Sequence, residues 1–224
     1  MPRRKTGTRS SLAKSLSKAT TAATPECDSN SDTPDGNPRM CFDSVRAFHN
    51  WLDENHKTCI GGIWLMIPKK DSGKTGPTYL QALDEALCYG WIDSQIRKYN
   101  DLYYIQKFTP RRKRSKWSKV NRSKVLKLIK DGRMKQSGLE QIEKAKEDGR
   151  WDAAYDSPST ITMPDEFQNE LNKYPKAKEF YDNVLTKSNR FIILSQINDA
   201  KRDETRQRRI NKYIQMCLNN EKPK

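Results

Sequence analysis

A change from helix to strand periodicity at Gly90 constrains the fold of this chain more than any other feature of the sequence. Apolar residues recur at helical spacing from Thr78 onward, and the spacing of Thr78 to Gln81 is that of a capping box. Gly90 follows as a glycine suited to end this helix in the left-handed conformation. Residues 91–98 and 102–108 are rich in β-favouring side chains and alternate in character, so they predict a β-hairpin.

The remaining sequence predicts one more strand and several helices. Residues 63–67 are a short apolar run between a Gly-Gly pair and Pro68, which favours a buried strand. Helical spacing predicts one helix before this strand, two helices after the hairpin and four helices in the final third of the chain. We therefore expect an α+β protein. A small antiparallel sheet with packed helices would occupy residues 42–155, and a helical module would occupy residues 156–220.

Residues 1–41 form a basic tail with few large apolar side chains, so we expect this segment to be disordered. Its first 25 residues contain no acidic residue, which is typical of a mitochondrial transit peptide. The opening Pro2-Arg3-Arg4-Lys5 suits a nuclear-import patch instead, and a plain solvated tail is the third interpretation. The chain has five widely spaced cysteines, which indicate free thiols in a reducing compartment. We expect an intracellular protein, cytoplasmic or nuclear, with mitochondrial targeting left open and no transmembrane segment.

The formal net charge is +15, and most of the excess lies between Arg97 and Lys135. This stretch has fifteen Lys and Arg residues against two acidic residues. Such a balance favours an anionic partner, which could be a nucleic acid, a phosphorylated metabolite or an anionic lipid. A solvated cationic surface without a specific partner explains the same composition.

Aromatic residues lie close to this charge, which suggests a surface with both phosphate affinity and stacking capacity. An indole among cations gains little from exposure unless it contacts a ligand. The candidate ligand-binding residues are Trp91, Asp93, Arg111, Arg112, Ser115, Trp117 and Asn121.

The sequence contains no recognisable catalytic constellation. Asp93 could act as an acid or base while Arg111 and Arg112 clamp an anionic substrate, or it could simply pair with these arginines. We interpret His49 as a surface or helix-end residue and Glu85 as a solvated helix residue. No nucleotide-binding pattern and no zinc-ligand spacing occurs, so neither a cofactor nor a metal site is predicted.

Several motifs resemble the YdeI/OmpD-associated (OmdA-like) family over residues 42–220. They are Ala86-Leu87-Cys88-Tyr89-Gly90-Trp91-Ile92-Asp93, Phe108-Thr109-Pro110-Arg111-Arg112, Ser115-x-Trp117-Ser118, Asn121, Gly132-Arg133-Met134, Gly149-Arg150-Trp151 and the ending Asp199-Ala200-Lys201-Arg202-x-Glu204-Thr205-Arg206-x-x-Arg209-Ile210. The resemblance implies a bacteriocin-protection label, and it implies no reaction and no cofactor.

Three interpretations of function remain open at this point. The leading one is a family protein that binds an anionic ligand on a basic, aromatic surface, in a protective or stress-response role. A small enzyme that uses Asp93 with Arg111 and Arg112 is the second, and non-specific association with nucleic acid is the third. Arg206 and Arg209 lie at i, i+3 and would either extend the same surface or pair with neighbouring acidic residues.

Overall fold

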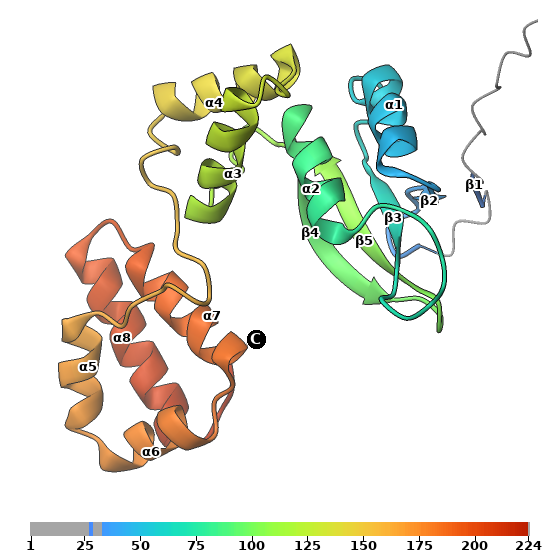
Figure 1. Cartoon of the computed structure of the whole chain (residues 1–224). Coiled ribbons are helices and arrows are strands. Elements are labelled where there is room, and N and C mark those ends of the chain that lie inside the picture. The colour runs from blue at the N-terminus through green and yellow to red at the C-terminus, as the bar shows by residue number, and fades with distance from the viewer. Residues whose placement is uncertain (1–26, 29–32, 224) are drawn as a thin grey trace, which may run out of the picture.

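The computed structural model describes residues 27–28 and 33–223, and in this part of the chain the protein has an α+β fold (Figure 1). The strands are β1 (Cys27–Asp28), β2 (Arg39–Met40), β3 (Ile63–Pro68), β4 (Trp91–Lys98) and β5 (Tyr103–Pro110). The helices are α1 (Val45–Asn55), α2 (Tyr79–Cys88), α3 (Lys119–Lys130), α4 (Gln136–Glu147), α5 (Asp165–Asn172), α6 (Pro175–Asn183), α7 (Lys187–Asn198) and α8 (Asp203–Leu218). None of these helices is long and apolar enough to cross a membrane.

The five strands form one mixed sheet in the order β1-β2-β3-β5-β4. The hairpin of β4 and β5 is confirmed, and β3 pairs antiparallel with β5. The expected antiparallel sheet is extended by β2, which pairs in parallel with β3. Most of the basic tail, including the proposed targeting segment, lies outside the described residues. Within residues 33–41, however, the chain contacts the sheet, although the sequence places the end of the tail at residue 41.

Besides the pairing of β2 with β3, Asp35 holds this part of the tail against the sheet. Asp35 accepts a hydrogen bond from Trp64 Nε1 at 2.8 Å, and its other carboxylate oxygen lies 2.8 Å from Lys107 Nζ. Partial burial raises the pKa of Asp35, but hydrogen bonds from Lys107, Trp64 and Asn37 outweigh burial and hold this pKa below its usual range. The face of the sheet that carries Trp64 is therefore covered by chain that precedes the first predicted helix.

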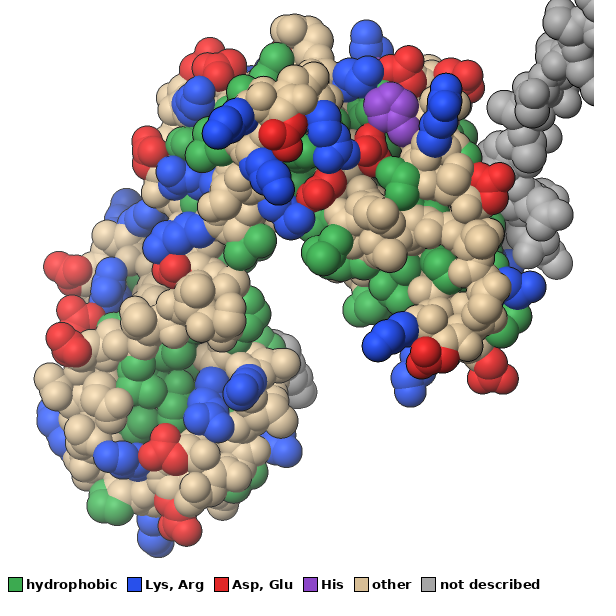
Figure 2. Space-filling model, viewed as in Figure 1, with side chains coloured by type: hydrophobic (Ala, Val, Ile, Leu, Met, Phe, Trp, Pro, Cys, Tyr) green, Lys and Arg blue, Asp and Glu red, His purple; other side chains and the backbone are tan. Residues whose placement is uncertain are grey.

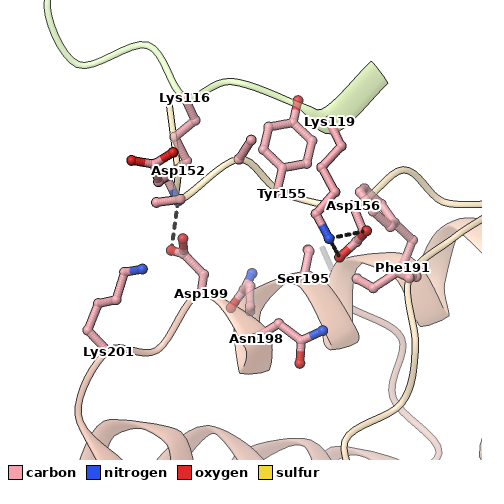
Figure 3. Close-up of a pocket in the computed structure, with 14 residues that line it drawn as sticks. Lys116, Lys119, Asp152, Tyr155, Asp156, Phe191, Ser195, Asn198, Asp199 and Lys201 are labelled. Carbon is pink, nitrogen blue, oxygen red and sulfur yellow. Dashed lines mark hydrogen bonds and ion pairs between the residues drawn. The ribbon is translucent and has the colours of Figure 1, made fainter. Parts of the chain in front are cut away.

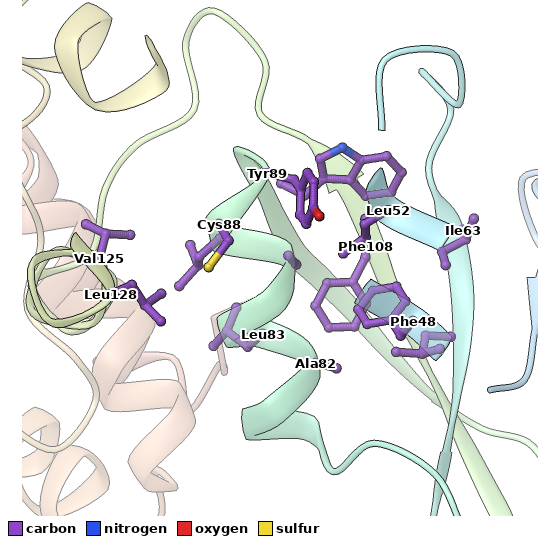
Figure 4. Close-up of a cluster of buried hydrophobic side chains, with 14 of the residues drawn as sticks. Phe48, Leu52, Ile63, Ala82, Leu83, Cys88, Tyr89, Phe108, Val125 and Leu128 are labelled. Carbon is purple, nitrogen blue, oxygen red and sulfur yellow. The ribbon is translucent and has the colours of Figure 1, made fainter. Parts of the chain in front are cut away.

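The opposite face of the sheet packs against α1 and α2 and forms the first hydrophobic core. Ile63 and Phe108 lie on this face beside Phe48 of α1 (Figure 4). On its far side, α2 places Leu83 and Cys88 toward α3, so the core continues away from the sheet to Val125 and Leu128 (Figure 4). Fully burying each large apolar side chain contributes about 1.5–3 kcal/mol to folding.

The last four helices enclose a second hydrophobic core. Phe167, Tyr181, Ile193 and Ile210 come from α5, α6, α7 and α8, and all four are buried. Figure 1 shows these helices as a group set apart from the sheet, joined to α4 by an extended segment. The helical module predicted from periodicity therefore has a core of its own.

A glycine permits close contact between α4 and the end of α2. A Cβ atom at Gly138 would lie 2.2 Å from the carbonyl oxygen of Cys88, a distance that real Cβ atoms do not reach. Gly90 ends the preceding turn at a φ of 77°, and a Cβ there would meet the backbone of Ser137 at 2.9 Å. Two glycines, one on each side of the contact, thus allow the backbones to approach.

We expect Gly138→Ala to lower the free energy of unfolding by about 1–3 kcal/mol, because the added methyl group overpacks this contact. In a helix without such a contact the same change raises stability by about 1 kcal/mol. Urea denaturation followed by circular dichroism measures the effect, with Asn169→Ala on the exposed side of α5 as a control. An unchanged or increased stability would show that α4 moves away from α2 without cost.

Candidate anion-binding site

Arg111 is a buried residue at the point where β5 leaves the sheet. Its backbone N–H donates to the carbonyl of Gly90 at 3.0 Å. The basic run, residues 111–119, therefore begins next to the turn that ends α2. Its guanidinium carbon lies 3.6 Å from the centroid of the Trp117 ring, and Nη1 donates to the carbonyl of Lys116 at 3.2 Å. Arg111 is 6% exposed and Trp117 is 2% exposed. The two side chains form a buried cation–π pair.

The remaining donors of this pair have no acceptor among the described residues. Nε and Nη2 of Arg111 are buried without a hydrogen-bond partner there, and so is Nε1 of Trp117. Burial lowers the pKa of Arg111 to about 10, an effect that the nearby Arg150 increases and that Tyr155 and Asp93 oppose. The guanidinium therefore stays charged at neutral pH, and each unsatisfied buried donor costs about 1–3 kcal/mol.

Arg111 also lines a basic cavity of about 560 Å³. The other residues that line it are Lys113, Gln141, Lys144, Glu147, Asp148 and Arg150. Arg150 donates through Nε to both carboxylate oxygens of Asp148 at 2.8 Å and through Nη1 to the carbonyl of Ser115. Within the described chain no carboxylate lies within ion-pair distance of Lys113 or Lys144, so both ammonium groups are available to a ligand.

The structure does not expose the tryptophans that were expected to stack on a ligand. Trp91 is 1% exposed, and its Nε1 donates to the carbonyl of His56 at 3.2 Å. Trp117 packs edge to face on Trp151, with ring centroids 5.2 Å apart. The prediction of an aromatic surface is therefore wrong at Trp91 and Trp117, because both indoles belong to the core.

The other predicted site residues lie around Arg111 without converging on one point. Asp93 is half-buried and accepts a hydrogen bond from the hydroxyl of Tyr79 at 2.8 Å. Arg112 is exposed, and its backbone N–H donates to Ser115 Oγ at 3.0 Å. Asn121 is buried, and its backbone N–H donates to Ser118 Oγ at the start of α3. Of the predicted residues, Arg111 alone is among those that line the basic cavity.

Two cations of the basic run border a different cavity, also of about 560 Å³, between α7 and the chain at residues 116–119 and 152–156 (Figure 3). Lys116 Nζ lies 2.7 Å from Asp199, and Lys119 Nζ lies 2.8 Å from Asp156. The first of these ion pairs links the basic run to the C-terminal helices. These two lysines are therefore already occupied by carboxylates.

Arg206 and Arg209 form contacts inside the C-terminal module. Arg206 Nη1 lies 3.5 Å from Glu166, and Nη2 donates to the carbonyl of Ala200. Arg209 Nη1 donates to the carbonyl of Gln196. Neither residue is among those that line the basic cavity.

Sequence reasoning missed a second polar cluster, formed by His49 and Glu85. Glu85 was expected in solvent, but it is 6% exposed and accepts from His49 Nδ1 at 2.8 Å and from Arg133 Nη2. His49 was expected at the surface without a role, and its ring contacts this buried carboxylate. The signal in the sequence is that Glu85 lies in a helical segment, residues 82–88, whose other members are almost all apolar.

Comparison with known families identifies two parts of the chain. Residues 160–220 match the family model described as Bacteriocin-protection, YdeI or OmpD-Associated, so the resemblance is confirmed at the C-terminal helices. Residues 40–141 match a separate domain of unknown function, DUF8412. The motifs from Ala86 to Met134 therefore lie in a second described domain rather than in the matched YdeI/OmpD-associated region. Comparisons with curated proteins and with solved structures found no match.

We expect Glu85→Ala to lower the free energy of unfolding by about 1–3 kcal/mol, because His49 and Arg133 lose their shared acceptor. Glu140→Ala, at an exposed residue of α4, serves as the control and is expected to change stability by less than about 0.5 kcal/mol. Urea denaturation of both variants at pH 7 gives the comparison. Equal effects of the two substitutions would contradict a structural role for the buried carboxylate.

Proposed function

We propose that this YdeI/OmpD-associated protein binds a small phosphate-like anion in the basic cavity at Arg111. The observation that carries the proposal is the buried Arg111 guanidinium, whose Nε and Nη2 have no acceptor in the described chain. An anion that accepts from these groups would recover the energy lost by leaving them unsatisfied. A modest rearrangement of the cavity wall would bring an anion into contact with them.

The charges around the cavity support an anion rather than a neutral ligand. Four of its seven lining residues are cationic, and one of the two acidic residues, Asp148, is engaged by Arg150. Lys113 and Lys144 would contact the outer oxygens of the anion while Arg111 holds the inner ones. A guanidinium binds phosphate and carboxylate through paired, parallel hydrogen bonds, which gives the site geometric selectivity.

The distribution of cations favours a small anion over a nucleic acid. Lys116 and Lys119 are committed to carboxylates, and the indoles of Trp91 and Trp117 offer no face for base stacking. Figure 2 shows Lys and Arg side chains interspersed with acidic ones over the visible face, without a continuous basic track. A nucleic-acid ligand needs such a track along its backbone.

The cellular setting is part of the same proposal. Free thiols at Cys59, Cys88 and Cys217 support a reducing, intracellular compartment. The bacteriocin-protection family that residues 160–220 match suggests a protective role. Anion binding would then serve as the molecular activity behind that role.

We expect isothermal titration calorimetry to detect binding of inorganic phosphate to the full-length protein, and Arg111→Met to weaken it at least tenfold, or about 1.4 kcal/mol. Methionine keeps an apolar stem against Trp117 but loses the cation–π contact and the hydrogen bond to Lys116, so we expect the free energy of unfolding to fall by about 1–3 kcal/mol, and circular dichroism checks that the titrated variant is folded. Lys144→Ala should weaken binding by several-fold. Lys127→Ala, an exposed lysine on α3 outside the cavity, should leave phosphate binding unchanged.

Two results would contradict the proposal. One is phosphate binding that Arg111→Met and Lys127→Ala weaken equally, because a diffuse surface charge would then explain it. The other is phosphate binding that is undetectable while single-stranded nucleic acid binds with a steep loss of affinity across a salt series.

A further inference from the structure

A smaller cavity combines a histidine, a buried carboxylate and two cations. It has a volume of about 320 Å³ and lies where α1 and α2 meet the turn between α3 and α4. The residues that line it are His49, Glu85, Gly132, Arg133, Met134 and Lys135. It shares no lining residue with the basic cavity at Arg111.

The hydrogen bonds around His49 define which of its nitrogens can accept a proton. The Glu85 carboxylate only accepts, so the hydrogen of a neutral imidazole is placed on Nδ1, 2.8 Å from Glu85 Oε2. The lone pair of the neutral ring then lies on Nε2. Glu85 is itself held by Arg133, which fixes the orientation of the carboxylate and through it the imidazole.

The nearest neighbour of Nε2 does not satisfy this lone pair. The hydroxyl of Tyr89 lies 3.3 Å from His49 Nε2, but its one hydrogen is donated to Asp53 Oδ1 at 2.9 Å. Burial, together with the hydrogen bond to Asp53 and the charge of Glu85, raises the pKa of Tyr89, so the phenol stays protonated. The His49 side chain is about one third exposed and lines the cavity.

Arg133 and Lys135 supply positive charge at the same cavity. Both are more than 40% exposed at their side chains, and Lys135 Nζ is 3.9 Å from Asp53, a loose contact. One cation can hold a carboxylate while the other stabilises negative charge that develops on a neighbouring oxygen. The small volume restricts the ligand to a molecule of a few heavy atoms.

We propose that His49 is a general base that enolises a small 2-oxo carboxylic acid bound by Arg133 and Lys135. Nε2 takes a proton from the carbon beside the ketone, and the C–H electron pair forms a carbon–carbon double bond. The carbonyl π electrons move to the ketone oxygen, and the resulting enolate lies beside the cations. The proton on Nε2 exchanges with solvent, and the imidazolium then protonates the carbon while the enolate oxygen electrons re-form the carbonyl, so the step is balanced without an oxidant or a metal.

Glu85 is a positioning residue in this scheme, because it acts on substrate only through His49. It keeps the Nδ1 hydrogen in place and stabilises the imidazolium that forms. The groups that face His49 are Glu85 and Tyr89 from α2 and its C-cap, Asp53 from the next turn of α1, and Arg133 and Lys135 from the α3–α4 turn.

The test is hydrogen–deuterium exchange at the methyl group of pyruvate in D₂O, followed by proton NMR with the full-length protein. We expect exchange at least tenfold faster than in buffer alone. His49→Gln should reduce it to the buffer rate, and Glu85→Gln should reduce kcat and change the pH profile. Lys135→Met, at an exposed residue, should raise KM more than it lowers kcat. His56→Gln, whose ring nitrogen contacts the carbonyl of Leu52, should exchange pyruvate as the wild type does.

Exchange no faster than buffer would overturn the proposal, and so would full exchange by His49→Gln with the wild-type circular dichroism spectrum. If His49→Gln and His56→Gln lost pyruvate exchange equally, the loss would be an effect on folding, and this result would also overturn the proposal. The outcome is independent of phosphate binding at Arg111. Arg111→Met should leave pyruvate exchange unchanged.

Discussion

The stacking of Arg111 on Trp117 is the contact on which the arrangement around the hairpin depends. Arg111 is tied through its backbone to Gly90, the residue that ends α2, and through its side chain to an indole just before α3. The carbonyl of Trp117 accepts from the N–H of Tyr155, and its ring packs on Trp151. One cation–π pair thus connects Gly90 just before β4, the basic run and the last part of the first core at Trp151. A guanidinium suits this role because it can stack on an aromatic face and donate in its own plane at the same time.

This arrangement explains why a run of cations does not become a continuous basic surface. Arg111 points into the core, Lys116 pairs with a residue of the C-terminal helices, and Lys119 pairs within the connection between the two cores. What remains for a ligand is the cluster of Lys113 and Lys144 beside Arg111, while Arg150 already pairs with Asp148. Net charge alone therefore overstates how much of the run is free, since pairing with a carboxylate offsets part of the attraction of a cation for a further anion.

The sequence predicted those parts of the fold that depend on local periodicity. The capping box at Thr78, the glycine at the end of α2 and the hairpin after it are all present. Strands β1 and β2 were missed because each has two residues and is defined by pairing with distant chain. The burial of Trp117 was missed because this residue lies in the irregular segment between β5 and α3, where no periodicity applies and only tertiary contacts with Arg111 and Trp151 decide burial. The contact of His49 with Glu85 was missed for the same reason, since it joins residues on two helices.

Glu85 and Arg111 are both buried charges, but they differ in how far hydrogen bonds offset the free energy lost on desolvation. Glu85 has both carboxylate oxygens satisfied, one by His49 and one by Arg133, so its charge is stable without a ligand. Nε and Nη2 of Arg111 have no acceptor within the described residues, so burying this charge carries an energetic cost. A satisfied carboxylate is suited to hold a neighbouring group in one orientation, whereas unsatisfied donors beside a cavity are suited to capture an acceptor. Both charges are tied to α2, because Glu85 lies within this helix and Gly90, just after its end, accepts the backbone hydrogen bond from Arg111.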